Sequence, residues 1–147
     1  MALSLQEISD RLEINDLLVD YCEAVDTVNI DAFDNIFTTD ATIDYSAFGF
    51  PQTSYQETKD FLKGALKQVP CKQHIIANSR LWIEGDTARG KTLCLNPMTV
   101  PNEESPLQMT HYGLWYLDKF VRTAEGWRIC ERIEEKSYTY TFAGELS

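Results

Sequence analysis

The change from helical to β-strand patterning falls in residues 74–98, which read HIIANSRLWIEGDTARGKTLCLNPM. Two extended runs, 74–83 and 87–98, flank a glycine-centred turn at 84–86. Runs that are rich in isoleucine, leucine, threonine and tryptophan on both sides of such a turn are typical of a β-hairpin. The segment therefore predicts two long antiparallel strands.

The strand pattern continues toward the C-terminus. Residues 107–121 and 127–140 predict two further long strands, which are joined by a turn at 124–126. The stretch 100–106 contains two prolines and two glutamates and predicts a loop in solvent. The second half of the chain is thus expected to be an antiparallel meander.

The first half has helical patterning. Ser4 followed by Glu7 is a capping-box signature, and it predicts a helix that runs to about Asp26. Apolar residues recur in this helix with a period near 3.6, namely Ile8, Leu12, Ile14, Leu17, Leu18, Tyr21, Cys22 and Val25. Shorter helices are predicted at 31–37 and 54–69.

A short strand at 41–46 is predicted between these two helices, with Ile43 and Tyr45 on one face. Helices first and a long meander after predict the α+β class, with helices packed on one face of the sheet. The 147 residues, of which 44% are apolar, predict a single domain spanning 1–147.

Composition excludes several functions. A net charge of −10 repels phosphate backbones and anionic lipids, so neither a nucleic-acid partner nor a membrane partner is expected. The four cysteines, Cys22, Cys71, Cys94 and Cys130, lie far apart, so we expect buried thiols and no zinc site. The N-terminus lacks the pattern of a secretory signal, and a cytoplasmic location is expected.

Asp26 stands out among the acidic residues because it falls within the apolar stripe of the first helix. It also lies in the last turn, where the helix dipole disfavours negative charge, so it needs a hydrogen-bonding or cationic partner. It is a candidate catalytic residue, and a residue that caps the following turn is the alternative. His74 begins a predicted strand among isoleucines, and His111 on a later strand competes with it for a catalytic role. The pattern itself does not rank the two histidines.

Two tyrosines are also candidates. Tyr21 lies on the inward face of the first helix, and Tyr45 lies on the short strand. A buried phenol needs a partner for its hydroxyl, and that partner is either protein or substrate. Trp82, Trp115, Tyr116 and Trp127 are expected to build the core or a subunit contact.

The order and spacing of several short motifs resemble the SnoaL-like branch of the nuclear-transport-factor-type cone folds. These motifs are Tyr21-Cys-Glu-Ala-Val-Asp26, Phe37-Thr-Thr-Asp-Ala41, Ile43-Asp-Tyr45, Gln73-His74, Gly113-Leu-Trp-Tyr116 and Gly126-Trp-Arg128. The resemblance covers the chain almost end to end. It implies a cone-shaped α+β barrel, in which three helices pack on a strongly curved, mixed and mostly antiparallel sheet around a deep pocket.

Within this family the chain is similar to scytalone dehydratase and to bile-acid 7α-dehydratase. The resemblance implies that Asp26, His74, Tyr21 and Tyr45 are catalytic. The expected substrate-contacting residues are Val25, Phe48, Met98, Thr110 and Tyr112. Several of these differ from the residues that scytalone dehydratase has there, so the likeness does not extend to scytalone as the substrate.

We therefore expect a dehydratase-like lyase that needs no cofactor or metal and acts on a small apolar molecule. Asp26 would orient His74, which would act as the general base. An isomerase, a polyketide cyclase and a non-catalytic binding module stay open as alternatives, because this fold does not fix the function. The aromatic strand around Trp115 and Tyr116 predicts a homo-oligomer, either a dimer or a trimer.

Overall fold

The computed structural model describes residues 2–100 and 107–144. Its helical segments are α1 (Leu5–Asp26), η1 (Ile30–Asn35), η2 (Ser46–Phe48), α2 (Tyr55–Ala65) and η3 (Leu66–Gln68). Its strands are β1 (Phe37–Asp44), β2 (Gln52–Ser54), β3 (Ile75–Glu84), β4 (Thr87–Thr99), β5 (Met109–Thr123) and β6 (Gly126–Thr141). The predicted α+β class and the β3–β6 meander are confirmed.

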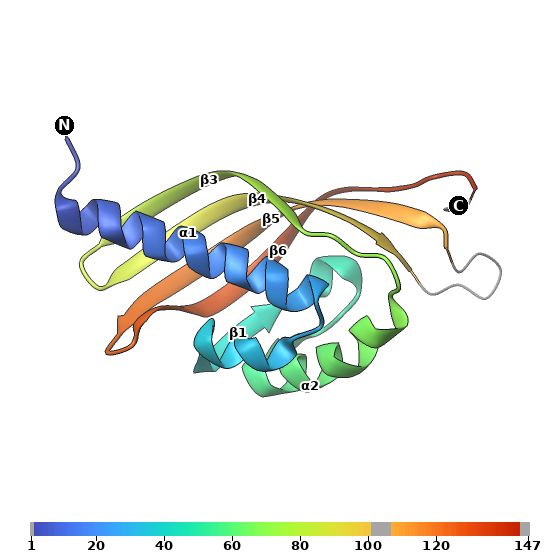
Figure 1. The fold of residues 1–147 in the computed structure, drawn as a ribbon, viewed down its shortest axis with the longest axis horizontal. Coiled ribbons are helices and arrows are strands. Elements are labelled where there is room, and N and C mark those ends of the chain that lie inside the picture. Colours follow the sequence, from blue (N-terminus) through green and yellow to red (C-terminus); the bar gives the residue numbers. More distant parts are fainter. Residues whose placement is uncertain (1, 101–106, 145–147) are drawn as a thin grey trace.

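The six strands form one sheet in the order β2-β1-β6-β5-β4-β3. Strand β1 runs parallel to β6, and all other neighbours are antiparallel. Helix α1 lies along one face of the long strands, while α2 lies beside β1 (Figure 1). The helices thus cover a single face of a mixed, mostly antiparallel sheet.

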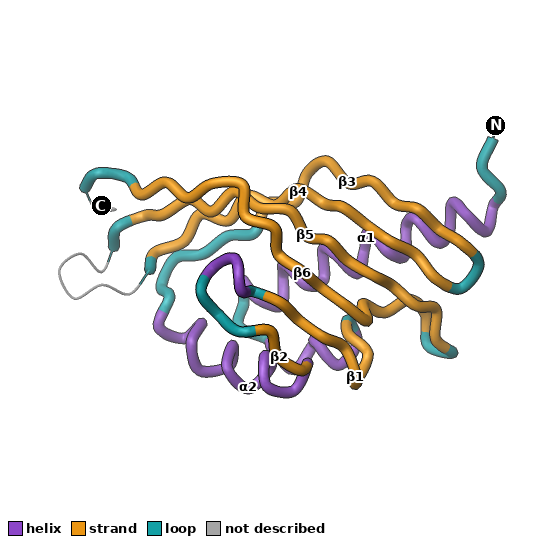
Figure 2. The backbone as a smooth tube through the Cα atoms, turned by 180° about the vertical axis from the view of Figure 1, so that it is seen from behind, coloured by secondary structure: helices purple, strands orange, loops and turns teal. Residues whose placement is uncertain are grey.

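The long strands bend strongly along their length. The pairing of β5 with β6 shifts register between Gly113 and Leu114, and again between Lys119 and Phe120. Such irregularities increase the local twist and bend a sheet. Seen from behind, the opposite face of β3–β6 is covered by no helix of the described residues (Figure 2). The sheet therefore has an inner face, which meets the helices, and an outer face.

The core lies between α1 and the inner face of the sheet. Helix α1 contributes Ile14, Leu18 and Tyr21, each at most 3% exposed. The sheet contributes Tyr116 and Ile129, which are 1% and 0% exposed. Burial of an apolar side chain of this size stabilises the fold by about 1.5–3 kcal/mol.

Three boundaries differ from the sequence prediction. The segment predicted as a third helix to residue 69 ends its α-helical part at Ala65 and continues as the 3-10 turn η3. The second helix is entirely 3-10. Strand β1 begins at Phe37, four residues before the predicted start, because Phe37 already pairs with Ile129 of β6. The predicted loop lies outside the described residues at 101–106.

The apolar stripe of the first helix is only partly buried. Ile8 and Leu12 are 41% and 60% exposed, because they point away from the side of α1 on which the buried Asp10 and Ile14 meet the sheet. Cys22 and Cys94 are buried as expected, whereas Cys71 and Cys130 are half-buried, so the prediction for the thiols was wrong in part. In the described part of the chain, no helix is long and apolar enough to cross a membrane.

Candidate active site

Asp26 and His74 are hydrogen-bonded partners. Asp26 is the last residue of α1, and His74 directly precedes β3. The Asp26 carboxylate accepts from the His74 backbone N–H at 2.9 Å through Oδ2. Its other oxygen, Oδ1, lies 2.7 Å from His74 Nδ1. The structure thus brings together the two residues that the sequence singled out, and it gives Asp26 the partner it needs.

This contact fixes the tautomer of the neutral imidazole. A carboxylate can only accept, so Nδ1 carries the proton and Nε2 holds a free lone pair. No described residue donates to or accepts from Nε2. The His74 side chain is 5% exposed and that of Asp26 24%. Neutral His74 therefore keeps one ring nitrogen with a free lone pair, and Asp26 is the more solvent-accessible of the two groups.

Backbone hydrogen bonds at the C-terminal end of α1 fix the position of Asp26. The backbone N–H of Val28 donates to Val25 and that of Asn29 donates to Ala24, at 3.1 and 2.8 Å. This is the pair of bonds that defines a Schellman motif. Val28 has φ of 58°, a left-handed conformation in which glycine is the usual residue. The helix therefore stops directly after Asp26 without the glycine that normally marks such an end.

The two candidate tyrosines share a hydrogen bond. The hydroxyls of Tyr21 and Tyr45 are 2.9 Å apart, and both side chains are buried. Burial raises the pKa of both phenols above the ordinary value. The Tyr21 ring lies edge-on to the His74 ring, with centroids 6.3 Å apart. One phenol donates to the other, which leaves one O–H available to a ligand beside His74.

A buried ion pair lies beneath Tyr21, and the sequence analysis missed it. Arg132 donates through Nε and one terminal nitrogen to the two oxygens of Asp118, both at 2.8 Å. Neither side chain is more than 1% exposed. The guanidinium carbon lies 4.1 Å from the Tyr21 ring centroid and 4.0 Å from that of Tyr116. Two aromatic faces and one carboxylate therefore hold this cation in place.

Glu134 is the second interior carboxyl group that the sequence analysis missed. It follows Arg132 by two residues on β6, so both side chains point to the inner face of the sheet. Burial raises its pKa from the ordinary 4.5 to about 8. In the sequence, Arg132-Ile-Glu134-Glu-Lys136 has the charge pattern of a strand in solvent, and nothing in it marks these side chains as interior.

Two of the expected substrate-contacting residues lie together. Phe48 and Tyr112 pack edge-to-face with ring centroids 5.5 Å apart, and both are half-buried. Thr110 is buried, and its hydroxyl is bonded to that of Thr141 at 3.0 Å. Val25 is 3% exposed within the core.

Met98 pairs with Thr110 across β4 and β5 and is half-buried.

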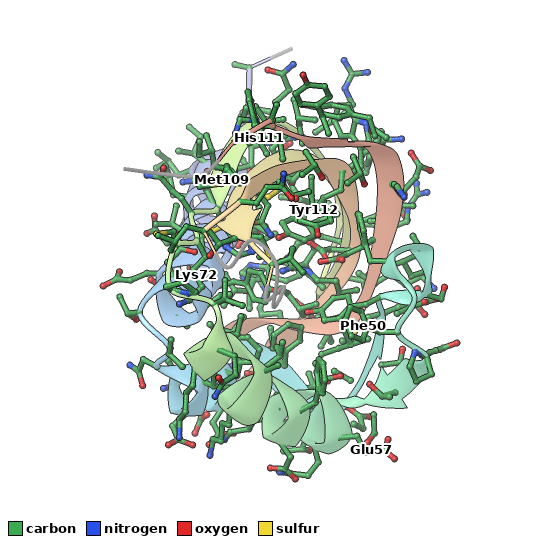
Figure 3. The ribbon with its side chains drawn as sticks, turned by 90° about the vertical axis from the view of Figure 1, so that its right-hand side faces the viewer. Phe50, Glu57, Lys72, Met109, His111 and Tyr112 are labelled. Atoms are coloured by element: carbon green, nitrogen blue, oxygen red, sulfur yellow. The ribbon has the colours of Figure 1, made fainter. Side chains whose placement is uncertain are left out.

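His111 lies away from Asp26. Its ring packs on Phe142 with centroids 4.7 Å apart. The side chains of His111 and Tyr112 point to opposite sides of β5, with Tyr112 toward the interior (Figure 3). The structure therefore ranks the two histidines, since only His74 meets Asp26.

Figure 3 looks into the end of the curved sheet where Tyr112, Phe50 and Lys72 lie around the interior. Two hollows are lined wholly by described residues: one lies beside the start of α1 and the β3–β4 turn, and the other lies between the end of α1 and η1. Neither includes Asp26 or His74. The apolar pocket predicted around Asp26 is thus neither of these two hollows and stays a prediction. Within the described ranges, no three His, Cys, Asp or Glu side chains are grouped so that they could hold a metal ion.

Comparison with known proteins places this geometry in a family. The family model described as a SnoaL-like domain matches residues 6–133. The chain belongs to the SnoaL-like family. An uncharacterised protein of Mycobacterium tuberculosis is 44% identical over 136 residues, which are 92% of this chain and 91% of the relative. A protein of Mycobacterium bovis, also uncharacterised, matches to the same extent.

Solved structures have the same fold as this SnoaL-like domain. A hexachlorocyclohexane dehydrochlorinase from Novosphingobium barchaimii superposes with a TM-score of 0.82, at 20% identity over 95% of this chain and 94% of that one. A putative scytalone dehydratase from Novosphingobium aromaticivorans gives 0.80, at 17% identity over 95% and 92%. A putative aromatic ring hydroxylase from the same organism gives 0.81, at 26% identity over 92% and 94%. The expected cone fold is confirmed.

Proposed function

We propose that this protein is a cofactor-independent lyase that eliminates water from a small apolar hydroxy-carbonyl compound. The observation that carries the proposal is the 2.7 Å contact between His74 Nδ1 and Asp26 Oδ1. In the neutral imidazole this contact keeps the proton on Nδ1 and leaves the Nε2 lone pair free, and an imidazole nitrogen with a free lone pair can act as a general base. Two of the structural neighbours are named as a dehydratase and a dehydrochlorinase, and both names denote elimination.

The reaction would begin at the carbon between the carbonyl and the hydroxyl-bearing carbon. His74 Nε2 removes a proton from this carbon, and Asp26 stabilises the imidazolium that forms. The electron pair of the broken C–H bond delocalises into the carbonyl group, which gives an enolate. The free O–H of the Tyr21–Tyr45 pair donates to the developing negative charge, and such a preorganised donor is worth most in the transition state. The enolate then expels the β-hydroxyl group.

Charge and lining favour a neutral, apolar substrate. The protein has a net charge of −10, which disfavours the approach of an anion. The Tyr112 side chain points toward the interior at this end of the sheet (Figure 3), and the Phe48 ring packs against it, so both rings would contact an aromatic or polycyclic ligand. The substrate class is therefore a neutral hydroxy ketone with a large apolar group.

The proposal is tested with the β-hydroxy ketone formed from benzaldehyde and acetone, whose dehydration gives the absorbing enone benzylideneacetone. His74→Gln should lower kcat/KM by about 10²–10⁴-fold, because the general base is lost. His111→Gln is the matched control and should keep the rate, since His111 packs against Phe142 away from Asp26. Binding of the ketone by the wild type without turnover would favour a binding module instead.

We also propose that the outer face of the sheet joins copies of this chain. It carries Trp82 and Ile133, which are 43% and 36% exposed, together with the half-buried Trp115. No helix of the described residues covers this face (Figure 2). Large exposed apolar side chains on an uncovered sheet face are typical of an interaction surface, here together with the ion pairs Lys91–Glu135 and Lys119–Glu131, and a symmetric dimer buries them in the simplest way.

A further inference from the structure

Glu134 lies among the groups that would surround the reacting atoms. Strand β6 turns Arg132 and Glu134 to the inner face, and Glu134 pairs with Tyr116 across β5 and β6. On the other side of β6, Asp44 pairs with Ile133, so Tyr45 comes next to Glu134. The carboxyl group therefore lies between two buried phenols, and one of them, Tyr45, is bonded to Tyr21 beside His74.

Glu134 is enclosed by protein but not sealed off. Burial is the main cause of its raised pKa, yet the residue keeps accessible surface and is half-buried. A side chain that lines an interior space is expected to be surrounded by protein and still to keep some accessible surface. No described residue forms a hydrogen bond with its carboxyl group, and a group without internal partners is free to bind a ligand.

Burial keeps Glu134 protonated, because the charges around it act in opposite directions and largely offset one another. Arg132 is the nearby cation, but both oxygens of Asp118 already bind it and offset its charge. Asp118 and Asp44 add negative charge, which disfavours a further anion. The remaining titratable neighbours are the phenols of Tyr21, Tyr45 and Tyr116 and the thiol of Cys94, which burial keeps neutral. Lys136, the next inward-facing residue of β6, is a second cation on this face, and its ammonium group lies 5.8 Å from the Phe48 ring centroid. Glu134 thus remains a neutral carboxylic acid, with a pKa of about 8.

We propose that Glu134 is the general acid that protonates the departing hydroxyl group. This role rests on the proposed lyase function. After His74 removes the α-proton, the enolate electrons form the double bond and the carbon–oxygen bond breaks. The leaving oxygen takes the Glu134 proton and departs as water. Glu134 becomes a carboxylate, and the proton on His74 returns to it through solvent, which restores both groups.

The proposed dehydration needs a general acid, and Glu134 fits this role. Hydroxide is a poor leaving group, so elimination of water needs a proton donor, whereas a double-bond shift expels nothing. A general acid works best with a pKa near the working pH, and Glu134 meets this condition better than the tyrosines, whose pKa values lie well above it. The pairing of a free base with a neutral acid therefore selects dehydration over isomerisation.

Two substrates that give the same enone test this role. One is the β-hydroxy ketone above, and the other carries para-nitrophenoxide in place of the hydroxyl group, which leaves without a proton. Glu134→Gln should lower the rate for the hydroxy ketone by about 10²–10⁴-fold and that for the aryloxy ketone by less than about tenfold. Glu135→Gln is the matched control, because the adjacent Glu135 is exposed on the outer face and pairs with Lys91.

The outcomes separate the two proposals. An equal loss on both substrates, or no loss on either, overturns the general-acid role of Glu134. A rate that His74→Gln leaves unchanged on both overturns the lyase proposal instead. Should the wild type turn over neither ketone, a carbon-13 NMR titration of the glutamate carboxyls, assigned with Glu134→Gln, still decides. A Glu134 carboxyl that is ionised at neutral pH contradicts the role, and a protonated one supports it.

Discussion

Asp26 lies at the end of a helix, where the macrodipole opposes its negative charge, and His74 offsets that cost. The carboxylate receives a backbone N–H and an imidazole N–H from this one residue. Each hydrogen bond to an ionised carboxylate is stronger than one between neutral groups. The arrangement therefore stabilises the Asp26 anion and orients the imidazole together.

Glu134 should make stability depend on pH. Its pKa rises from the ordinary 4.5 to about 8 in the folded protein, so folded chains retain a proton that unfolded chains have lost between these values. The contribution of this group to stability is complete below pH 4.5 and falls as pH rises toward 8, at up to about 1.4 kcal/mol per unit. Urea unfolding across this range should show wild type losing stability relative to Glu134→Gln, and a constant difference would contradict it.

Only part of the site could be predicted from the residues. Asp26 and His74 were singled out because a carboxylate and an imidazole are unusual in apolar surroundings, and family likeness paired them. Asp118, Arg132 and Glu134 carried no such signal, because alternating charges on a strand are typical of a solvent-exposed face. The curvature of β5 and β6 moves these residues inside, and no local pattern reports that curvature.

At the scale of elements, α1 is attached to the β5–β6 hairpin by Asp10. This carboxylate accepts two bonds from Arg122, at 2.6 and 2.8 Å, and one from the Trp127 indole at 3.2 Å. Asp10 is 3% exposed, and Arg122 holds the pKa of its carboxyl well below the ordinary value. The contact fixes the first half of a helix whose apolar residues there are partly exposed.

Asp10→Ala should therefore destabilise the fold by about 2–4 kcal/mol, because it leaves the Arg122 charge and the indole N–H without their partner. Asp16→Ala on the exposed face of the same helix is the control and should change stability by less than about 0.5 kcal/mol. Denaturant unfolding at neutral pH measures both. Equal effects would mean that Asp10 contributes no more than a surface carboxylate.

The boundaries of helices and strands matched local sequence signals, except where contacts between residues distant in the sequence determined them. The N-cap at Ser4 and the glycine turn were predicted correctly, because each signal lies within a few residues. Only the Ser4 half of the predicted capping box forms, since the Glu7 carboxylate accepts from Arg11. The end of α1 lacked its usual signal, since Val28 occupies the left-handed position that favours glycine. Strand β1 began earlier than predicted because its partner, β6, is more than 80 residues away and is invisible to local patterns.

At the scale of the whole molecule, the two proposed functions belong to opposite faces of the sheet. The inner face carries the proposed acid–base groups, and the outer face of β3–β6 carries exposed apolar side chains with no described helix over them (Figure 2). The same alternation along each strand supplies both faces, so neighbours such as Trp115 and Tyr116 serve different purposes. Tyr116 is 1% exposed in the core, while Trp115 is half-buried beside Lys91.

Trp115→Glu should convert an associated wild type into monomers, because it places a charge at the centre of the outer face. The Lys91 ammonium group lies 5.0 Å from the Trp115 ring centroid and already pairs with Glu135, so it reduces the repulsion between Glu135 and the new carboxylate. Val19→Glu, at an exposed position on α1, is the control and should leave the assembly intact. Sedimentation equilibrium measures all three proteins. A monomeric wild type, or association that Trp115→Glu leaves unchanged, would contradict the proposed interface.

The central claim is that Asp26 and His74 form a base that abstracts a proton from a carbon acid. The most direct measurement is kcat/KM for the β-hydroxy ketone with wild type and with His74→Gln, after circular dichroism has shown that both are folded. We predict a loss of about 10²–10⁴-fold in the variant, with His111→Gln close to wild type. A folded His74→Gln protein that eliminates water at the wild-type rate would contradict the claim.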